Sequence, residues 1–151
     1  MFLVKDPAIA REYKIRELGT QEPAWAVILS VIHFEWTIRR AIIAMGTSPN
    51  VEIRAKLKSC HGCDKYKDLW KEEVFPNMEL RLPEIVTNWD GLRRAFRLRH
   101  RLVHGVGSCG LEYAQERMIW AINATVDVRK LCEARGINLD SRLPVRKKLK
   151  F

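Results

Sequence analysis

The segment RRAFRLRHRLVHG, residues 93–105, concentrates the side chains of this chain that are best suited to chemistry. It holds five arginines, two histidines and no acid in thirteen residues. Histidine titrates near neutral pH and can accept or donate a proton, while arginine stays charged and can bind a phosphate through two N–H groups. Together they suit RNA cleavage in which a base activates the 2′-hydroxyl for attack on the neighbouring phosphate. This chemistry needs no metal ion. A solvated basic helix face is the alternative interpretation.

The arginines of this segment separate into two groups on a helix that turns by about 100° per residue. An outward stripe consists of Arg93, Arg97, His100 and His104, with Arg101 at its edge. We predict that Arg93, Arg97 and Arg101 contact RNA phosphates. Arg99 instead lies on the flank of the face that we expect to pack. That face consists of Ile85, Trp89, Leu92, Phe96 and Val103.

A buried arginine needs an anion beside it, and Glu35 is the candidate. Glu35 lies in a long apolar segment, at the edge of the face that we expect to pack. That face consists of Trp25, Ile28, Leu29, Ile32, Trp36 and Ile43. Glu35 also stands four residues before Arg39, which is the favourable order for an ion pair along one helix. The pairings of Glu35 with Arg99 and with Arg39 are alternatives that can coexist.

Arg99 and His104 would point about 140° apart on an unbroken helix. To meet on one ligand, the backbone must bend or end between them, or a second subunit must supply one of them. Gly105 directly after His104 favours a helix end there.

The composition is that of a globular protein with an excess of positive charge. The 151 residues are 47% hydrophobic and 30% charged, with a formal net charge of +9. Such a charge favours an acidic partner, most commonly nucleic acid. The most apolar run, residues 24–43, carries four ionisable residues that argue against a membrane span; they are His33, Glu35, Arg39 and Arg40. The first residues lack the features of a signal peptide, so we expect a cytoplasmic protein whose cysteines are thiols.

Helical spacing interrupted by proline and glycine predicts an all-α fold, an up-and-down bundle of four to five helices. The expected helices span residues 7–18, 22–45, 48–60 with a continuation at 64–75, 82–104 and 111–135. Residues 105–110, GVGSCG, form the clearest loop. We expect one helical domain over residues 1–140 and a loose basic tail over residues 141–151.

The sequence RHRLVHG, residues 99–105, resembles the motif of the HEPN superfamily. In that motif four to six residues separate an arginine from a following histidine, and a polar residue often stands directly after the arginine. Arg99, His100 and His104 match these positions. The expected helical layout also resembles the family, so the resemblance covers most of the chain in outline. It implies a HEPN-like bundle of four or five helices. It also implies a metal-independent endoribonuclease without a cofactor, acting as a toxin or phage-defence effector as many members do.

The resemblance further implies residue roles and partners. Arg99 would stabilise the scissile phosphate, His104 would be the general acid or base, and His100 would assist. Glu35 resembles an acid that many members carry in this helix, and it would orient Arg99. Family members commonly form homodimers in which two motifs face one another. A twofold axis near the motif would therefore make a composite active site from both chains.

Other partners and activities remain alternatives. In one toxin subgroup of the family, a partner nucleotidyltransferase modifies a tyrosine two residues after the histidine, but Val106 occupies that position here. An antitoxin or nucleotidyltransferase partner is therefore an open alternative. Some members have lost activity, so a non-catalytic helical adaptor that binds RNA or protein is the second interpretation of the whole chain.

A metal site is the weaker interpretation of two further patterns. Cys60 and Cys63 in CHGC have the spacing of half a zinc site, but a structural zinc needs four ligands and the other cysteines stand alone. His100 and His104 could share a metal on one helix face, with no third ligand evident nearby. We therefore predict no metal site.

Overall fold

The computed structural model describes residues 5–105 and 107–147, and all regular secondary structure within these ranges is helical. The predicted all-α class is confirmed. The chain divides into two compact units. The first comprises the described parts of Met1–Glu35 and Asn88–Val126, and the second comprises those of Trp36–Thr87 and Asp127–Phe151.

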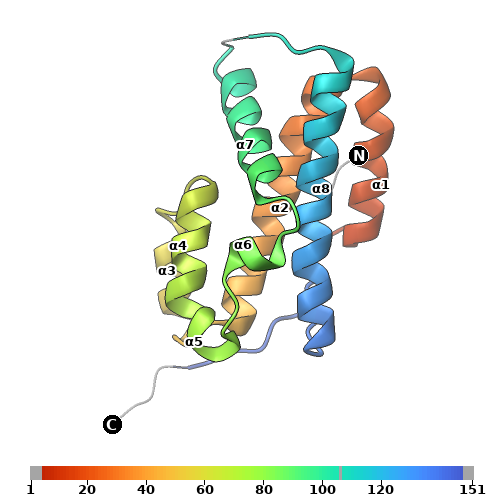
Figure 1. Cartoon of the computed structure of the whole chain (residues 1–151). Coiled ribbons are helices and arrows are strands. Elements are labelled where there is room, and N and C mark those ends of the chain that lie inside the picture. Colours follow the sequence, from red (N-terminus) through yellow and green to blue (C-terminus); the bar gives the residue numbers. More distant parts are fainter. Residues whose placement is uncertain (1–4, 106, 148–151) are drawn as a thin grey trace. The chain divides into compact units, whose positions relative to one another are not determined.

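Eight helices occur among the described residues (Figure 1). They are α1 (Ala8–Gln21), α2 (Pro23–Met45), α3 (Asn50–Leu57), α4 (Cys63–Glu73), α5 (Phe75–Met78), α6 (Leu82–Ile85), α7 (Trp89–Val103) and α8 (Leu111–Ala134). Helices α2 and α8 contribute to both units. The predicted number, four to five, is too low for three reasons. The predicted continuation at residues 64–75 is a separate helix, the predicted helix over residues 82–104 is two helices, and a one-turn helix, α5, forms where FPN was expected to end helical structure.

The core of the first unit is built by α1, α7 and the parts of α2 and α8 that belong to it, which lie side by side in Figure 1. Their buried cluster consists of Ile15, Ala26, Val27, Leu98, Ala114, Met118 and Ile122. Gly19 allows α1 to approach α8 closely, because a Cβ atom there would lie 2.8 Å from Sδ of Met118. This packing orients α7 against α2 and so positions the candidate site.

The packed face of α2 in the first unit is not the predicted one. Its buried residues include Ala26, Val27, Val31 and Phe34, whereas Trp25 is 59% exposed. Residues one and two turns after Trp25 on the same outer face, Ile28 and Ile32, are only half-buried. The prediction is wrong because α2 is apolar on almost every side. The positions of its largest side chains therefore do not identify the face that packs.

A buried polar network joins α1 to α2. Nε of Arg11 donates to Nδ1 of His33 at 3.2 Å, and Nε2 of His33 lies 2.9 Å from a carboxylate oxygen of Glu12. All three side chains are almost fully buried. Since Nδ1 of His33 accepts a hydrogen bond, Nε2 carries the proton and donates to Glu12. The charges of Arg11 and Glu12 are thus both partnered within the bundle.

The predicted helix over residues 82–104 is two helices, α6 and α7. Val86 has extended backbone angles, and α7 begins only after Asn88, whose side chain accepts a hydrogen bond from the backbone N–H of Gly91 at 2.8 Å. Asparagine is a favoured residue at this position because its side chain satisfies an otherwise unpaired N–H of the first turn. The expectation of one continuous helix overlooked this capping residue.

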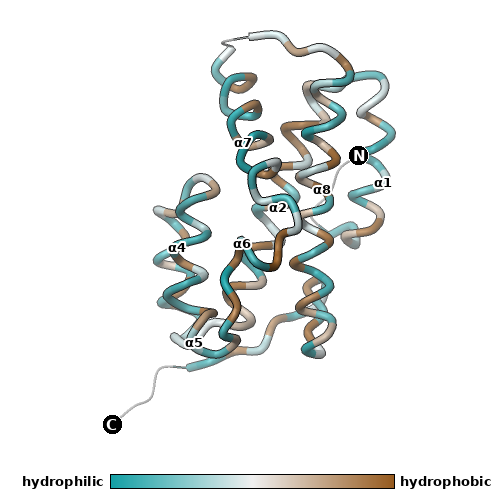
Figure 2. The backbone as a smooth tube through the Cα atoms, viewed as in Figure 1, coloured by the Kyte–Doolittle hydropathy of each residue, from teal (hydrophilic) through white to brown (hydrophobic). Residues whose placement is uncertain are grey.

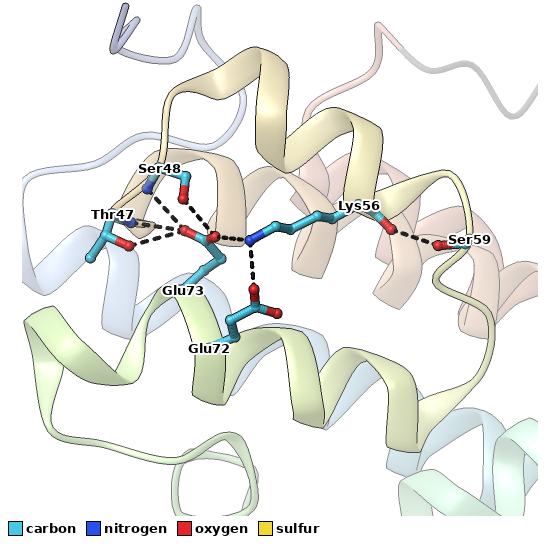
Figure 3. Close-up of polar contacts among 6 residues, drawn as sticks. All are labelled: Thr47, Ser48, Lys56, Ser59, Glu72 and Glu73. Carbon is cyan, nitrogen blue, oxygen red and sulfur yellow. Dashed lines mark hydrogen bonds and ion pairs between the residues drawn. The ribbon is translucent and has the colours of Figure 1, made fainter. Parts of the chain in front are cut away.

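In the second unit, the carboxylate of Glu73 in α4 binds to α3 and to the segment before it (Figure 3). One oxygen accepts from the backbone N–H groups of Thr47 and Ser48 at 3.2 and 2.9 Å. The other accepts from Oγ of Ser48 at 2.8 Å and from Nζ of Lys56 at 2.7 Å. Burial alone would raise the pKa of Glu73, but the hydrogen bonds from Lys56, Ser48 and Thr47 outweigh it and lower this pKa to about 2.

The C-terminal segment is anchored as far as residue 147, so the expectation of a loose tail is wrong for residues 141–147. The guanidinium of Arg146 donates to the carbonyls of Ile43, Ala44 and Ser48 at 2.6, 3.2 and 3.0 Å. Two of these carbonyls belong to the last turn of α2, where carbonyl groups have no hydrogen-bond partners within the helix. Asn50 accepts from the backbone N–H of Arg146 at 3.0 Å, which fixes the segment further.

None of the helices in the described residues is long and apolar enough to cross a membrane.

Candidate functional site

Helix α7 has the amphipathic character that the sequence predicts. Figure 2 shows hydrophilic and hydrophobic residues alternating along its turns. Leu92 and Phe96 of the predicted packed face are buried, as are Ala95 and Leu98. Val103 departs from the prediction, since it is 58% exposed at the last helical position. Ile85 belongs to α6 and is outside this helix.

Arg99 points toward α2 and pairs with Glu35, which confirms the predicted contact. Nη1 of Arg99 lies 2.5 Å from Oε1 of Glu35, and the two side chains are only 23% and 15% exposed. The guanidinium carbon of Arg99 also lies 5.4 Å from the ring centroid of Phe96, one turn earlier. A charge-assisted hydrogen bond and an aromatic neighbour thus hold this arginine at the edge of the packed face.

His104 lies at the end of α7, with φ −90° and ψ 4°, and its backbone N–H still donates to the carbonyl of His100 at 3.1 Å. Gly105 follows with φ +67°, the left-handed conformation that commonly terminates a helix. The rings of His100 and His104 are adjacent, with centroids 4.3 Å apart, and both residues are exposed. The last helical residue is therefore Val103, and His104 is the capping residue that directly follows it.

The two motif residues are not brought together within one chain. Arg99 contacts Glu35 and Phe96, while His104 contacts His100, and no described contact joins Arg99 to His104. Because the helical path persists to His104, the expected divergence of about 140° is retained. Among the solutions that the sequence left open, an early bend of the helix is therefore not the one adopted.

The predicted basic stripe lies on the solvent side of α7. Arg97 and Arg101 are exposed and Arg93 is half-buried. Arg94 adds a fourth cation that was not among the predicted RNA contacts, and its Nε lies 3.0 Å from Asp90 in an exposed pair. The terminal nitrogen of Arg101 reaches the loop after α7, where a Cβ atom on Gly107 would lie 3.1 Å from it.

An exposed apolar surface borders the Arg99–Glu35 pair. Ile32 and Ile28 precede Glu35 by three and seven residues, so they occupy the same side of α2, and Trp25 continues this outer face. On α7, Val103 follows Arg99 by one turn. The pair is thus flanked on both helices by side chains that are apolar and incompletely buried.

The described residues contain no group of three or more histidine, cysteine or acidic side chains that could hold a metal ion. Cys60 and Cys63 both lie in buried positions. The segment between them contains Gly62 at φ +88°, where the chain turns into α4.

One cluster of aromatic and basic side chains was not predicted from the sequence. Arg117 of α8 is 7% exposed, and its guanidinium carbon lies 3.3 Å from the ring centroid of Tyr113 and 5.3 Å from that of Trp120. The spacing of these residues, at positions i, i+4 and i+7, places them on one helix side. That spacing was the available signal.

The comparisons with known proteins found no match to a protein-family model, to a curated protein or to a solved structure. Val106, the position that differs from the modified tyrosine of one HEPN subgroup, lies outside the described residues.

Proposed function

We propose that the protein is a HEPN-type, metal-independent endoribonuclease of the cytoplasm that acts as a toxin or phage-defence effector. The observation that carries the proposal is the environment of Arg99. A cation that is 23% exposed, paired to Glu35 and followed five residues later by an exposed histidine is difficult to explain as a solvated basic face. The resemblance of residues 99–104 to the HEPN motif supports the same conclusion.

In the proposed reaction, Arg99 stabilises the negative charge that develops on the scissile phosphate. Glu35 orients its guanidinium, and one oxygen of Glu35 accepts the Nη1 donor, so the remaining N–H groups of Arg99 can bind phosphate. The net attraction for the phosphate is reduced by the charge of Glu35, and the cations of α7 offset this reduction.

His104 transfers the proton. It removes the proton from the 2′-hydroxyl or donates one to the leaving 5′-oxygen, and both steps need an imidazole that solvent and substrate can reach. The exposed position of His104 at the end of α7 meets this requirement. His100 lies against it with ring centroids 4.3 Å apart and assists by holding its ring or a phosphate.

In the proposed homodimer, Arg99 of one chain meets His104 of the other, because the two residues do not meet within one chain. A twofold axis beside α2 and α7 would bring His104 of one chain toward Arg99 of the other. The apolar residues around the Arg99–Glu35 pair support this arrangement, because Trp25 and Val103 are 59% and 58% exposed in the isolated chain. Covering them would exclude water from the Arg99 guanidinium and strengthen its interaction with phosphate.

The proposal is tested by replacing His104 with alanine and assaying cleavage of total RNA in EDTA. Loss of a general acid or base typically costs at least about a hundredfold in rate, so we expect cleavage to fall by that factor or more. The fold should persist, because the His104 side chain is exposed.

His61→Ala is the matched control, since His61 is also exposed but belongs to the second unit. Wild-type rates for His61→Ala and a strongly reduced rate for His104→Ala support the proposal. Undiminished cleavage by His104→Ala contradicts the assignment.

A non-catalytic adaptor for RNA or protein is the second candidate function. The separation of Arg99 from His104 within one chain favours it, because the Arg99–Glu35 pair then has a purely structural role. An adaptor binds RNA through the basic stripe with a steep dependence on salt concentration and releases no cleavage products. An antitoxin or nucleotidyltransferase partner remains a prediction that co-purification with the product of an adjacent gene would test.

A further inference from the structure

The side of α8 that holds Tyr113 carries an exposed aromatic ring fixed against a buried cation. Tyr113 is 44% exposed, while Arg117 behind it is 7% exposed. The guanidinium carbon of Arg117 lies 3.3 Å from the centroid of the Tyr113 ring, which is a stacking distance. One face of the ring is therefore covered by the guanidinium, and its exposed area lies on the opposite face and the edge.

Four contacts immobilise Arg117. Besides the Tyr113 ring, its guanidinium carbon lies 5.3 Å from the ring centroid of Trp120. Its Nη1 donates to the backbone carbonyl of Tyr113 at 3.2 Å and lies 3.3 Å from Oε1 of Glu116. The immobilised cation behind the ring already restricts the motion of the Tyr113 side chain. Stacking of a planar ligand on Tyr113 therefore costs little additional side-chain entropy.

The register of α7 against α8 places arginines of α7 level with this cluster of α8. Trp120 lies against Gly91, where a Cβ atom would be 2.8 Å from Cδ2 of the indole. Because α7 and α8 are successive helices joined by a short loop and run in opposite directions, three residues along α7 correspond to three residues back along α8. Arg94 is therefore level with Arg117.

The same register brings the end of α7 toward Tyr113. Leu98 lies seven residues after Gly91 along α7 and Tyr113 lies seven residues before Trp120 along α8, so the Gly91–Trp120 contact makes Tyr113 level with Leu98. Arg101 follows Leu98 by three residues on the same side of the helix. His104 in turn follows Arg101 by three residues, which links the aromatic ring to the proposed proton-transfer group along one surface of the first unit.

We infer that Tyr113 is a stacking platform for an unpaired base of single-stranded RNA, with Arg94 and Arg101 contacting the adjacent phosphates. Exposed aromatic rings interspersed with cations are the usual means of binding single strands, because every base has a face that can stack. A base within a duplex is already stacked on both sides and cannot use this ring. This inference rests on the proposed function and specifies its substrate as an unpaired segment of RNA.

The test uses the full chain and a short single-stranded RNA. The RNA contains 2-aminopurine as a fluorescent base, and every ribose carries a 2′-O-methyl group. The methyl groups remove the attacking hydroxyl, so binding is measured without cleavage. Stacking quenches the fluorescence of 2-aminopurine. We expect saturable quenching by the wild type, and about tenfold weaker binding without quenching by Tyr113→Leu, because base–aromatic stacking contributes strongly to affinity.

Tyr113→Phe is the matched control, because it keeps the ring and its stacking on Arg117. It should bind and quench as the wild type does. Thermal unfolding of both variants checks the fold, which should persist since Tyr113 is 44% exposed. If Tyr113→Leu quenches and binds as the wild type does, the stacking inference is wrong.

Cleavage kinetics separate failure of this inference from failure of the proposed function. If the stacking inference is correct, Tyr113→Leu raises KM for unmodified RNA and leaves kcat near the wild-type value. Cleavage that depends on His104 but not on Tyr113 refutes the platform alone. A wild-type protein that neither binds nor cleaves RNA refutes both the platform and the proposed function.

Discussion

Arg99 and His104 occupy different environments although only five residues separate them. Arg99 is held against Glu35 and Phe96, whereas His104 is exposed beside His100. A fixed cation and an accessible imidazole are the two properties that the proposed reaction requires. The division also means that mutations at the two positions should have different costs, in both stability and activity at Arg99 and in activity alone at His104.

The pairing of Arg99 with Glu35 is tested by Glu35→Gln, which keeps the shape of the side chain and removes its charge. Because both side chains are largely buried, we expect the free energy of unfolding to fall by about 1–2 kcal/mol. Urea unfolding at neutral pH measures this change. A double-mutant cycle with Arg99→Met should assign most of it to the pair.

Asp90→Asn is the control for that cycle. Asp90 pairs with Arg94, but the two side chains are 68% and 51% exposed, so the loss of this surface pair should change stability by less than about 0.5 kcal/mol. Equal effects of Glu35→Gln and Asp90→Asn would show that burial adds nothing to the Arg99–Glu35 pair.

At the scale of the elements, periodicity predicts where helices occur better than which face of an apolar helix is buried. The long segments that became α1, α2, α7 and α8 are recognisable from their spacing. The face of α2 is not, because Trp25, Ile28 and Ile32 offer as apolar a stripe as the one that packs. The buried face instead carries Ser30, which bonds to the carbonyl of Val27, and His33.

Local capping explains why the predicted helix over residues 82–104 is two helices, α6 and α7. The side chain of Asn88 satisfies the N–H of Gly91 and starts α7 there. Gly91 is required at this point because any side chain would collide with Asn88 and Trp120. Asparagine three residues before a glycine was visible in the sequence, but the collision with Trp120 depends on packing that periodicity does not report.

Glu73 connects α4 to α3 and to the segment before α3, and its low pKa makes this connection dependent on pH. The folded protein holds the pKa near 2, below the usual value of 4.5, so the unfolded chain binds the proton first as the pH falls. The stabilisation is complete above about pH 4.5 and is lost progressively toward about pH 2.

We therefore expect Glu73→Gln to lower the free energy of unfolding at neutral pH by about 2–3 kcal/mol. The same variant should lose less stability than the wild type between about pH 5 and about pH 2. Glu72→Gln is the matched control, since Glu72 also bonds to Lys56 but its side chain is 59% exposed. Parallel pH profiles for the wild type and Glu73→Gln would contradict this account.

At the scale of the whole molecule, the charge of +9 and the basic surface of α7 support the proposal that the ligand is an anionic polymer. The sequence predicted the all-α class, the outward stripe and the contact between Arg99 and Glu35. It could not predict how Arg99 and His104 reach one phosphate, because in the proposed homodimer that arrangement would depend on a second chain. The exposed Trp25 and Val103 show where such a chain would find an apolar surface.

The most direct test of the account is the cleavage of one RNA oligonucleotide by the wild-type protein in EDTA, with the DNA oligonucleotide of the same sequence as control. Attack by the 2′-hydroxyl leaves a 2′,3′-cyclic phosphate and a 5′-hydroxyl at the new ends. We expect these ends from the RNA and no products from the DNA. No cleavage of any single-stranded RNA in EDTA, or equal cleavage of the DNA, would contradict the proposed mechanism.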